Sequence, residues 1–456
     1  MRGPTLDPLG PIAEYHAALG GGWLRAGDAV DIALANTAEP RGEGARVFVQ
    51  HDADAARTRA AQLQQGGGRT LRTPLDRVIV SVKDNFDIAG QVTRAGSPTR
   101  AAAAPATRDA VAVERLRSAG AILVGRTSMS EFAYSVTGTH PAWQPPRNPW
   151  RRAEARIPGG STSGGAVSVS DRMAHVALGT DTGGSLRVPA ALCGLVGFRP
   201  SLGRVPSAGL FPLSPASDTI GSLAHCVDDC WRVDGVVAGR PLRIRRDRAP
   251  RTFRFAVAES LFTEQLAAPV AAAFERVLML LGRAGASVQR LPLPVFGELA
   301  ALCADGGITA AEAWRAHGAA GGAIHCVDAL VRQRILLGAR TDDQRLAQLK
   351  RQRAAIVRRF ARELRGVDVL LAPTVPITAP TIAEADGDGP EAQRINQRLL
   401  RNTVAITLVG GCAISLPCQA REEAPVGVML AAPGGHDARL FEAALFVESL
   451  LRYAQV

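Results

Sequence analysis

The chain has 456 residues, of which 46% are hydrophobic and 21% are charged, and this composition is typical of a globular protein. No stretch approaches the ~18 consecutive apolar residues of a membrane-spanning helix, so we expect no membrane span. The net charge is +11 at pH 7, but the basic residues are spread along the chain instead of forming a patch, which argues against nucleic-acid binding.

The seven cysteines and eight histidines predict neither a disulfide framework nor a metal site. A chain of this size needs no disulfides, and an odd number of cysteines fits reduced thiols. His225, Cys226 and Cys230 are close in sequence, but their spacing matches no zinc site. The N-terminal residues also lack the apolar segment of a secretory signal. We therefore expect a cytoplasmic protein.

The first part of the chain predicts helices and strands that build a sheet. Residues 1–70 are expected to form helices around a short strand at 47–50. An apolar strand follows at 77–83, and a helix at 109–120 leads into a strand at 121–125. The aspartate and glycine at the ends of this helix are residue types that cap helices. A strand–helix–strand unit of this kind predicts a mainly parallel sheet.

Two long proline-rich loops, at 134–150 and 205–220, are expected to bind a substrate. Loops of this length in compact domains are usually functional or disordered, and their aromatic content favours a binding wall. The side chains that we expect to line the pocket are Met129, Tyr134, Trp143, Leu210 and Phe211.

Beyond residue 239 the alternation continues to the end of the chain. The expected strands are 254–258, 287–291, 367–373, 412–417 and 426–430, and the expected helices are 270–281, several near 309–337, 342–365, 390–404 and 437–453. The helix at 342–365 is basic and amphipathic, and its arginines expected to face solvent are Arg351, Arg353, Arg358, Arg359 and Arg362. Because the chain shows no internal repeat and no linker, we expect a single domain over residues 1–456.

Two glycine-rich turns, at 159–165 and 183–184, each carry a serine. Glycine at this density indicates positive φ angles or a close approach of the backbone to another group. One helix and one strand, at 174–179, separate the turns, so Ser161 and Ser185 can lie at the same end of a sheet. Each serine could also simply cap a helix.

Lys83 is one of only two lysines among 53 lysine and arginine residues, and it ends the apolar strand 77–83. A buried lysine can lose its proton, whereas arginine cannot. A serine needs a base to become a nucleophile, and no histidine lies in a recognisable nucleophile–base motif. Lys83 can therefore be the base, with one serine relaying a proton from the other. The structural alternative is a buried pair of Lys83 with Asp84.

Ser185 follows a strand and precedes a helix expected at 186–192. The backbone N–H groups of Thr182, Gly183, Gly184 and Ser185 then lie at a helix N-terminus. Such donors can form an oxyanion hole that stabilises the negative charge of a tetrahedral intermediate.

These segments together resemble the amidase signature family. The motifs are K-D-N-F-D at 83–87, P-G-G-S-T-S-G-G at 158–165 and G-T-D-T-G-G-S-L-R-V-P-A at 179–190. Further similar segments lie at 125–134, 217–221, 413–418 and 425–430. The resemblance covers the chain from about residue 30 onward, and this combination of motifs is specific.

The resemblance implies a Ser–cis-Ser–Lys triad without a metal or organic cofactor. Ser185 would be the nucleophile, Ser161 (joined to Gly160 by a cis peptide) would pass the proton, and Lys83 would be the base. The implied supporting residues are Gly160, Ser163, Thr180, Asp181 and Arg187. The implied α/β fold is a single α/β/α domain around a large mixed sheet, with a catalytic core at about 75–230.

Three functions remain open from the sequence. The first is a stand-alone hydrolase, monomeric or homodimeric, of a neutral apolar or aryl amide, carbamate or ester. The second is a glutamine-dependent amidotransferase subunit, although the resemblance implies an acidic residue near Leu400 for that function, and residues 400–403 contain no carboxylate. The third is a catalytically silent binding protein. Ser128 stands where asparagine is common in the family, which can change contacts near the substrate carbonyl.

Overall fold

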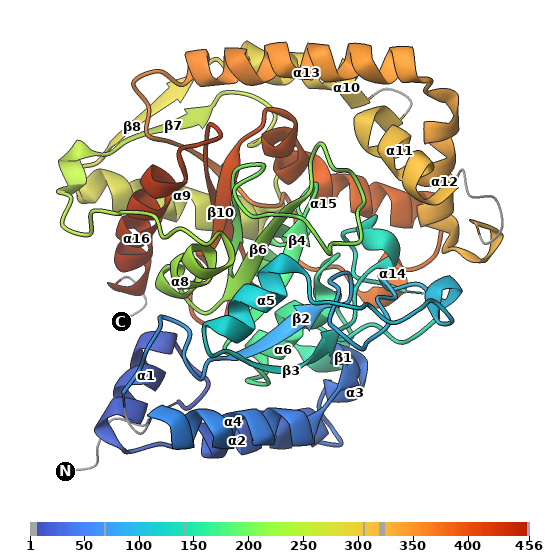
Figure 1. Cartoon of the computed structure of the whole chain (residues 1–456). Helices are drawn as coiled ribbons and strands as arrows, with labels where there is room; N and C mark the ends of the chain where they lie inside the picture. Colours follow the sequence, from blue (N-terminus) through green and yellow to red (C-terminus); the bar gives the residue numbers. More distant parts are fainter. Residues whose placement is uncertain (1–6, 68–69, 141, 304–305, 319–323, 454–456) are drawn as a thin grey trace.

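The fold is organised around one mixed sheet of eleven strands, in the order β1-β3-β2-β4-β6-β5-β10-β11-β9-β7-β8 (Figure 1). The computed structural model describes residues 7–67, 70–140, 142–303, 306–318 and 324–453. The strands are β1 (Phe48–His51), β2 (Ile79–Lys83), β3 (Ile122–Thr127), β4 (Val176–Asp181), β5 (Val196–Arg199), β6 (Thr219–Ala224), β7 (Arg254–Ala258), β8 (Ser287–Leu291), β9 (Val369–Pro373), β10 (Cys412–Pro417) and β11 (Gly427–Ala432).

Parallel pairs lie toward both sides of the sheet, and antiparallel pairs fill its centre. β2 pairs in parallel with β3 and with β4, and β7 pairs in parallel with β8 and with β9. The pairs from β4 through β6, β5, β10 and β11 to β9 are antiparallel. The mainly parallel sheet predicted from the sequence is therefore wrong for the centre, whereas the large mixed sheet is confirmed.

Helices cover both faces of the sheet, because successive strand residues point to opposite faces and both sets are apolar. In β4, Val176 and Leu178 pack in one hydrophobic cluster and Ala177 in another. The first face is covered by α5 (Val111–Ser118), α8 (Val227–Val237), α9 (Ala268–Arg283) and α16 (Asp437–Tyr453). The opposite face is covered by α6 (Ser163–Ser170), α7 (Arg187–Cys193), α13 (Asp343–Glu363) and α15 (Pro390–Leu408). The predicted α/β/α architecture is confirmed.

The remaining helices, apart from α14, lie at two opposite ends of the molecule (Figure 1). The N-terminal helices are α1 (Ile12–Gly21), α2 (Ala26–Ala38), α3 (Gly44–Val47) and α4 (Ala53–Gly67). At the other end, α13 runs beside shorter helices, which are α10 (Leu299–Cys303), α11 (Gly307–Ala313) and α12 (Ala329–Leu337). The last helix, α14 (Ile382–Ala385), lies near α15. Among the described residues, no helix combines the length and hydrophobicity needed to cross a lipid bilayer.

Several local predictions need correction. β5 was not expected, and the loop predicted at 205–220 ends two residues earlier because β6 begins at Thr219. Asp109 does not cap α5, because its carboxylate accepts the N–H of Ala89 at 2.8 Å and pairs with Arg117 at 2.9 Å. Residue 141 of the first loop and residues 319–323 of the helical region near 309–337 lie outside the described residues.

Arg353 does not belong to the solvated face of α13. It is buried, and its guanidinium donates to the carbonyl groups of Ala216, Thr407 and Leu408. It therefore joins α13 to the end of α15 and to the loop before β6. Three carbonyl acceptors satisfy donors that would otherwise be costly to bury.

Candidate active site

Lys83 is the last residue of β2, and its amine lies within hydrogen-bond distance of two hydroxyl groups. The adjacent strands β2 and β4 are parallel, so their carboxyl ends meet at one edge of the sheet. Nζ of Lys83 lies 2.7 Å from Oγ of Ser161 and 2.8 Å from Oγ1 of Thr180 on β4. Asp84 does not pair with Lys83, because its carboxylate accepts a 2.9 Å bond from Nε of Arg126. The expected alternative pairing of Lys83 with Asp84 is therefore absent.

Burial determines the charge of the Lys83 amine. The side chain is fully buried, and the resulting desolvation lowers the pKa of Lys83 to about 7, although Asp181 and Asp218 favour the charged form. An amine with this pKa is substantially uncharged near neutral pH. It can therefore accept a proton from a hydroxyl group.

Ser161 lies in the tight turn that precedes α6. The Gly160–Ser161 peptide is cis, and the N–H of Gly160 donates to the carbonyl of Val136 at 2.8 Å. A Cβ atom at Gly160 would lie 2.8 Å from the backbone nitrogen of Gly138, so a larger residue would displace this turn. Ser163 donates weakly to the carbonyl of Ser128 at 3.4 Å. The expected supporting positions Gly160 and Ser163 thus lie beside Ser161.

Asp181 holds the second glycine-rich turn in place. Its carboxylate accepts bonds from Arg187 at 2.9 Å and Arg199 at 3.3 Å, and from the N–H of Leu186 at 3.2 Å. Burial alone would raise the pKa of Asp181, but the two guanidinium groups and this N–H lower it to about 2. The carboxylate therefore remains charged, and it connects the end of β4 to the start of α7.

Four consecutive backbone N–H groups in this turn are free to bind a ligand. Across the described part of the chain, the N–H groups of Thr182, Gly183, Gly184 and Ser185 donate to no acceptor. Gly184 has φ of 152°, and a Cβ atom at this position would overlap the side chain of Thr403. The turn therefore requires glycine, and its free donors have the character of an oxyanion hole.

Ser185 lines a cavity. It is 2% exposed, and its hydroxyl bonds to no other described residue, whereas its carbonyl accepts the N–H of Thr162 at 3.3 Å. Within the described ranges, no hydrogen bond joins the hydroxyls of Ser161 and Ser185. Neither serine caps a helix, since Thr162 precedes α6 and Leu186 precedes α7, both without a side-chain capping bond.

The cavity beside Ser185 has a volume of about 560 Å³, which is the size of a small-molecule site. Thr182 and Gly183 line it together with Ser185, and helices α10, α11, α12 and α15 supply much of the rest. Its apolar side chains include Leu213, Leu302, Ile308, Leu330, Leu337 and Leu400. Its polar side chains include Gln333, Arg334, Gln393, Gln397 and Arg401, and none of its described lining residues is an aspartate or glutamate.

Of the five expected pocket residues, only Tyr134 lines this cavity as far as the described residues show. Met129 is buried behind the wall, in a hydrophobic cluster with Leu213. Leu210 packs against the core on the opposite face and forms a bridge with Phe86. Met129 is buried and Leu210 is half-buried, and neither lines this cavity.

Phe211 and Trp143 also lie elsewhere. Phe211 packs in a cluster of three rings with Phe132 and His317, at ring distances of 5.6 Å and 4.9 Å, and the Phe132 and His317 rings also stack on each other at 4.8 Å. Trp143 stacks on His140 at 3.7 Å and lines a different pocket, together with Ser128. Trp143 and Phe211 thus stack on rings of the protein itself and do not line the cavity, unlike Tyr134.

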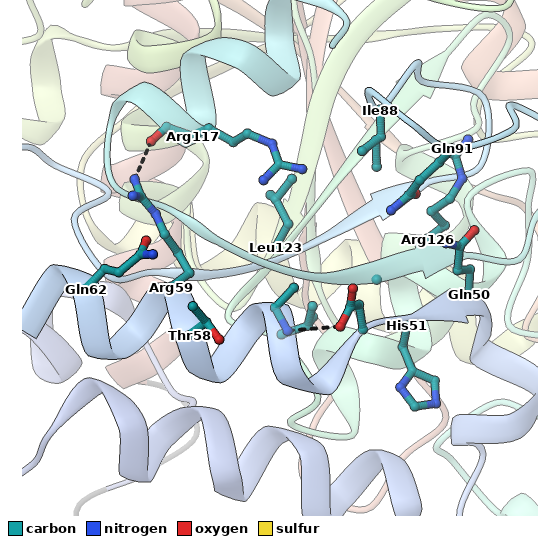
Figure 2. Close-up of a pocket in the computed structure, with 14 residues that line it drawn as sticks. Gln50, His51, Thr58, Arg59, Gln62, Ile88, Gln91, Arg117, Leu123 and Arg126 are labelled. Carbon is teal, nitrogen blue, oxygen red and sulfur yellow. Dashed lines mark hydrogen bonds between the residues drawn. The ribbon is translucent and has the colours of Figure 1, made fainter. Parts of the chain in front are cut away.

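A separate pocket lies between α4 and β3 (Figure 2). Figure 2 shows the arginines Arg59 and Arg117 on one side, where Arg59 donates to the carbonyl of Arg117 at 3.0 Å. Arg126 lines the other side, and its Nε is held by Asp84. None of Lys83, Ser161 and Ser185 lines this pocket, so it does not belong to the candidate active site.

Four residues of the site are not predicted by the sequence. Asn85 donates to Oγ1 of Thr180 at 3.1 Å, and Asp218 accepts a 2.6 Å bond from Thr182. Both residues stand inside segments that resemble family motifs, which is the signal that could have identified them. Arg401 in the cavity wall had a weaker signal, namely that the stretch 400–403 carries an arginine where a carboxylate was sought, and Arg334 had no signal in the sequence.

The sequence model of amidases matches residues 38–441 of this chain. The chain belongs to the amidase signature family. The members of this family are enzymes that act on carbon–nitrogen bonds. Lys83, Ser161 and Ser185 all lie within the matched residues.

Similar proteins in this family include enzymes with different substrates. The 2-amino-5-chloromuconic acid deaminase of Comamonas testosteroni is 35% identical over 394 residues, which cover 83% of this chain and 82% of the deaminase. A glutamyl-tRNA(Gln) amidotransferase subunit of Symbiobacterium thermophilum is 31% identical over 472 residues and 95% of each chain.

Two solved structures support the same family assignment. A crystal structure of an amidase has a TM-score of 0.86 and 30% sequence identity, and the match covers 96% of this chain and 99% of that amidase. The peptide amidase of Stenotrophomonas maltophilia has a TM-score of 0.80 and 26% identity, with 97% of each chain covered.

Proposed function

We propose that this amidase-family protein hydrolyses an amide-type bond with Ser185 as nucleophile, Ser161 as proton relay and Lys83 as general base. The observation that carries this proposal is the 2.7 Å contact between the Lys83 amine and the Ser161 hydroxyl, in a turn that contacts Ser185. The lowered pKa of Lys83, about 7, suits a base at neutral pH.

In the first step, Oγ of Ser185 attacks the substrate carbonyl carbon. Its proton passes to Oγ of Ser161, whose own proton passes to Nζ of Lys83. The carbonyl oxygen becomes negative and accepts hydrogen bonds from the free N–H groups of residues 182–185. The C–N bond then breaks, and the leaving nitrogen receives the proton from Lys83 through Ser161. The product is an amine and an acyl-enzyme ester.

In the second step, water replaces the amine. Lys83 is again uncharged, so it accepts a proton from the water through Ser161 as the water oxygen bonds to the acyl carbon. When the bond to Oγ of Ser185 breaks, the proton returns to Ser185, and a carboxylic acid leaves. Thr180 and Asn85 keep the lysine amine at the relay through both steps, since Asn85 donates to Thr180 and Thr180 lies 2.8 Å from Nζ.

Carbamates and esters present the same carbonyl with an equal or better leaving group, so we include them with anilides among the substrates. The relatives support bond breaking at a carbon–nitrogen bond through their names, which are deaminase, amidase and peptide amidase. They differ in substrate, so the choice among these carbonyl compounds has to come from this chain's own cavity.

An amidotransferase subunit is the second candidate, because a relative of that name matches 95% of this chain. The cavity argues against it, since none of the described lining residues is a carboxylate that could bind the α-amino group of glutamine. Glutaminase activity together with copurification of a partner protein would favour this second function. Absence of glutaminase activity would exclude the amidotransferase function.

The test is a substrate panel with a serine variant. Wild-type protein is assayed with a primary amide, a p-nitroanilide, an aryl carbamate and an aryl ester. Ser185→Ala should reduce turnover by about 10³-fold or more, because no other group replaces the nucleophile. The exposed Ser207→Ala serves as the control and should leave turnover unchanged. Unaltered turnover in Ser185→Ala would overturn the mechanism, and failure of a fluorophosphonate to label Ser185 would favour a silent binding protein.

A further inference from the structure

Two arginines in the cavity wall have no carboxylate partner among the described residues. Arg334 on α12 donates to the carbonyl of Tyr134 at 2.6 Å, and Nε of Arg401 on α15 donates to Oδ1 of Asn402 at 3.0 Å. Both of these acceptors are uncharged. Within the described part of the chain, neither guanidinium forms an ion pair, which distinguishes them from the many surface arginines that do.

Arg401 is the less satisfied of the two. Its Nη2 is buried and has no hydrogen-bond partner among the described residues. Glu264 is the acidic residue that most affects it, but that residue is exposed and does not line the cavity. Desolvation lowers the pKa of Arg401, yet a guanidinium remains charged at any working pH. A buried N–H group of a charged side chain is costly when it has no hydrogen-bond acceptor, unless a ligand supplies that acceptor.

The described residues that line the cavity around these arginines add neutral hydrogen-bond donors and no carboxylate, although Asp328, outside the lining, acts on Arg334 through its charge. Gln393 on α15 donates to Gln333 on α12 at 3.1 Å, so the two helices are joined beside the arginines. Both glutamines line the cavity. A planar carboxylate matches the fork of a guanidinium group and can accept two parallel N–H bonds. The wall therefore has the composition of a carboxylate site.

We propose that the substrate carries a carboxylate, which Arg401 binds with the help of Arg334, at a distance along the cavity from the carbonyl that Ser185 attacks. This rests on the proposed amide hydrolysis and names its substrate class. It also revises the neutral apolar substrate expected from the sequence, since the aromatic residues behind that expectation, Tyr134 excepted, lie outside the cavity lining. The leucines of the cavity would contact the apolar chain between the two groups.

The test compares p-nitroanilides that differ in one charged group. Succinyl, glutaryl and adipoyl p-nitroanilides each have a neutral partner of equal chain length, namely butyryl, valeryl and hexanoyl p-nitroanilide. For the best chain length, kcat/KM of the carboxylate should exceed that of its neutral partner by about tenfold or more, as expected for hydrogen bonds to a charged group. Equal or faster hydrolysis of all neutral partners would overturn the proposal.

Variants of Arg401 separate the carboxylate site from the chemistry. Arg401→Gln should remove most of the preference, because it should lower kcat/KM for the carboxylates by about tenfold more than for the neutral anilides. Arg401→Lys keeps the charge and should retain part of the preference. Arg394→Gln is the matched control, because Arg394 lies on the same helix but is exposed and pairs with Glu391 at 2.5 Å. If Arg401→Gln left the preference for carboxylate substrates unchanged, Arg401 would not be the group that binds the carboxylate.

A binding measurement keeps this proposal separate from the proposed hydrolysis. Glutarate is titrated by calorimetry into Ser185→Ala protein and into the double variant with Arg401→Gln, with glutaramide as the neutral probe. We expect glutarate, but not glutaramide, to bind the first protein, and the second to bind it about tenfold more weakly or not at all. Hydrolysis of neutral anilides without glutarate binding would refute only the carboxylate site. Glutarate binding without any hydrolysis would refute only the proposed activity.

Discussion

The catalytic cluster around Lys83 and the wall of the cavity around Arg401 differ in whether their charged side chains have partners within the protein. In the cluster, Asp181 is paired with Arg187 and Arg199, and burial brings Lys83 close to neutrality at physiological pH. In the wall, Arg334 and Arg401 lack any described carboxylate partner. The charged side chains of the cluster are thus paired or close to neutral without a substrate, whereas the proposed carboxylate would supply the partner that the arginines of the wall lack. The two regions should therefore control different parts of the reaction, the rate of bond breaking and the choice of substrate.

The two regions also come from different parts of the chain. The cluster is built by β2, β4 and the turns before α6 and α7, within residues 83–199. The wall is built mostly by helices from residue 299 onward, together with Tyr134 and the loop before β6. Substitutions in the cluster should lower turnover for every substrate. Substitutions in the wall should change the ranking of substrates.

Replacing the lysine base should have the largest effect. Lys83→Arg keeps a positive charge but removes the possibility of deprotonation, so kcat should fall by about 10²–10⁴-fold for charged and neutral substrates alike. Lys350→Arg is the control, since the exposed Lys350 pairs with the buried Glu312 and arginine can keep that pair. Steady-state kinetics and thermal unfolding measure both variants. A folded Lys83→Arg protein with normal turnover would contradict the assigned base.

A methyl group in the second glycine turn should have the next largest effect. Gly184→Ala places a Cβ against Thr403 at a φ of 152°, so the turn with its free N–H groups should shift. Removing one oxyanion donor costs about 10²–10³-fold in kcat, and we expect a loss of that order. Gly203→Ala is the control, because Gly203 also has positive φ (75°) but an open environment. Equal losses in both variants would mean that backbone strain alone is responsible.

The pH profile should report the lysine. The uncharged amine is the active form, so kcat/KM for a neutral anilide should rise about tenfold per pH unit at low pH and level off above the pKa of Lys83, about 7. Arg401→Gln should not move this midpoint, since Arg401 lies in the cavity wall and the charges that act on Lys83 are Asp181 and Asp218. If kcat/KM stayed constant from about pH 5.5 to about pH 8.5, a titrating lysine base would be excluded.

The cluster could be predicted from the sequence because its signals are local. A lysine in an arginine-rich chain, at the end of an apolar strand, already indicates a special position, and glycine-rich turns indicate backbone that approaches other groups. The wall could not be predicted in this way. Arg401 contributes to a cavity only because α12 and α15 pack together. Arg353 is expected to be exposed from the pattern of its own helix, and only the tertiary fold brings the carbonyl groups of Ala216, Thr407 and Leu408 to its guanidinium.

The fold shows the same division. The α/β class and most long helices follow from hydrophobic periodicity, whereas the antiparallel centre of the sheet depends on long-range pairing, as in the pairing of β5 with β10. Aromatic content was a poor guide to the pocket. It indicates that Trp143 and Phe211 prefer a partner ring, but not that those partners are His140 and His317 instead of a substrate.

The smallest expected effect concerns a carboxylate between the two regions. Asp218 accepts hydrogen bonds from Thr182, Leu213 and Ser214, and its charge favours protonated Lys83. Asp218→Asn keeps the size and one acceptor but removes the charge, so the pKa of Lys83 should fall and the midpoint of the pH profile should move to lower pH. Burial raises the pKa of Asp218 itself, which limits the charge that is lost, and the shift should stay below about one pH unit.

The exposed Asp54→Asn is the control for this shift, because its side chain is 99% exposed and far less able to influence a buried amine. A midpoint that moves to higher pH in Asp218→Asn would mean that the hydrogen bond to Thr182, and not the charge, governs the lysine. In that case the cluster and the wall would be coupled through the turn at 182–185. The separation of rate from substrate choice would then fail at this one residue.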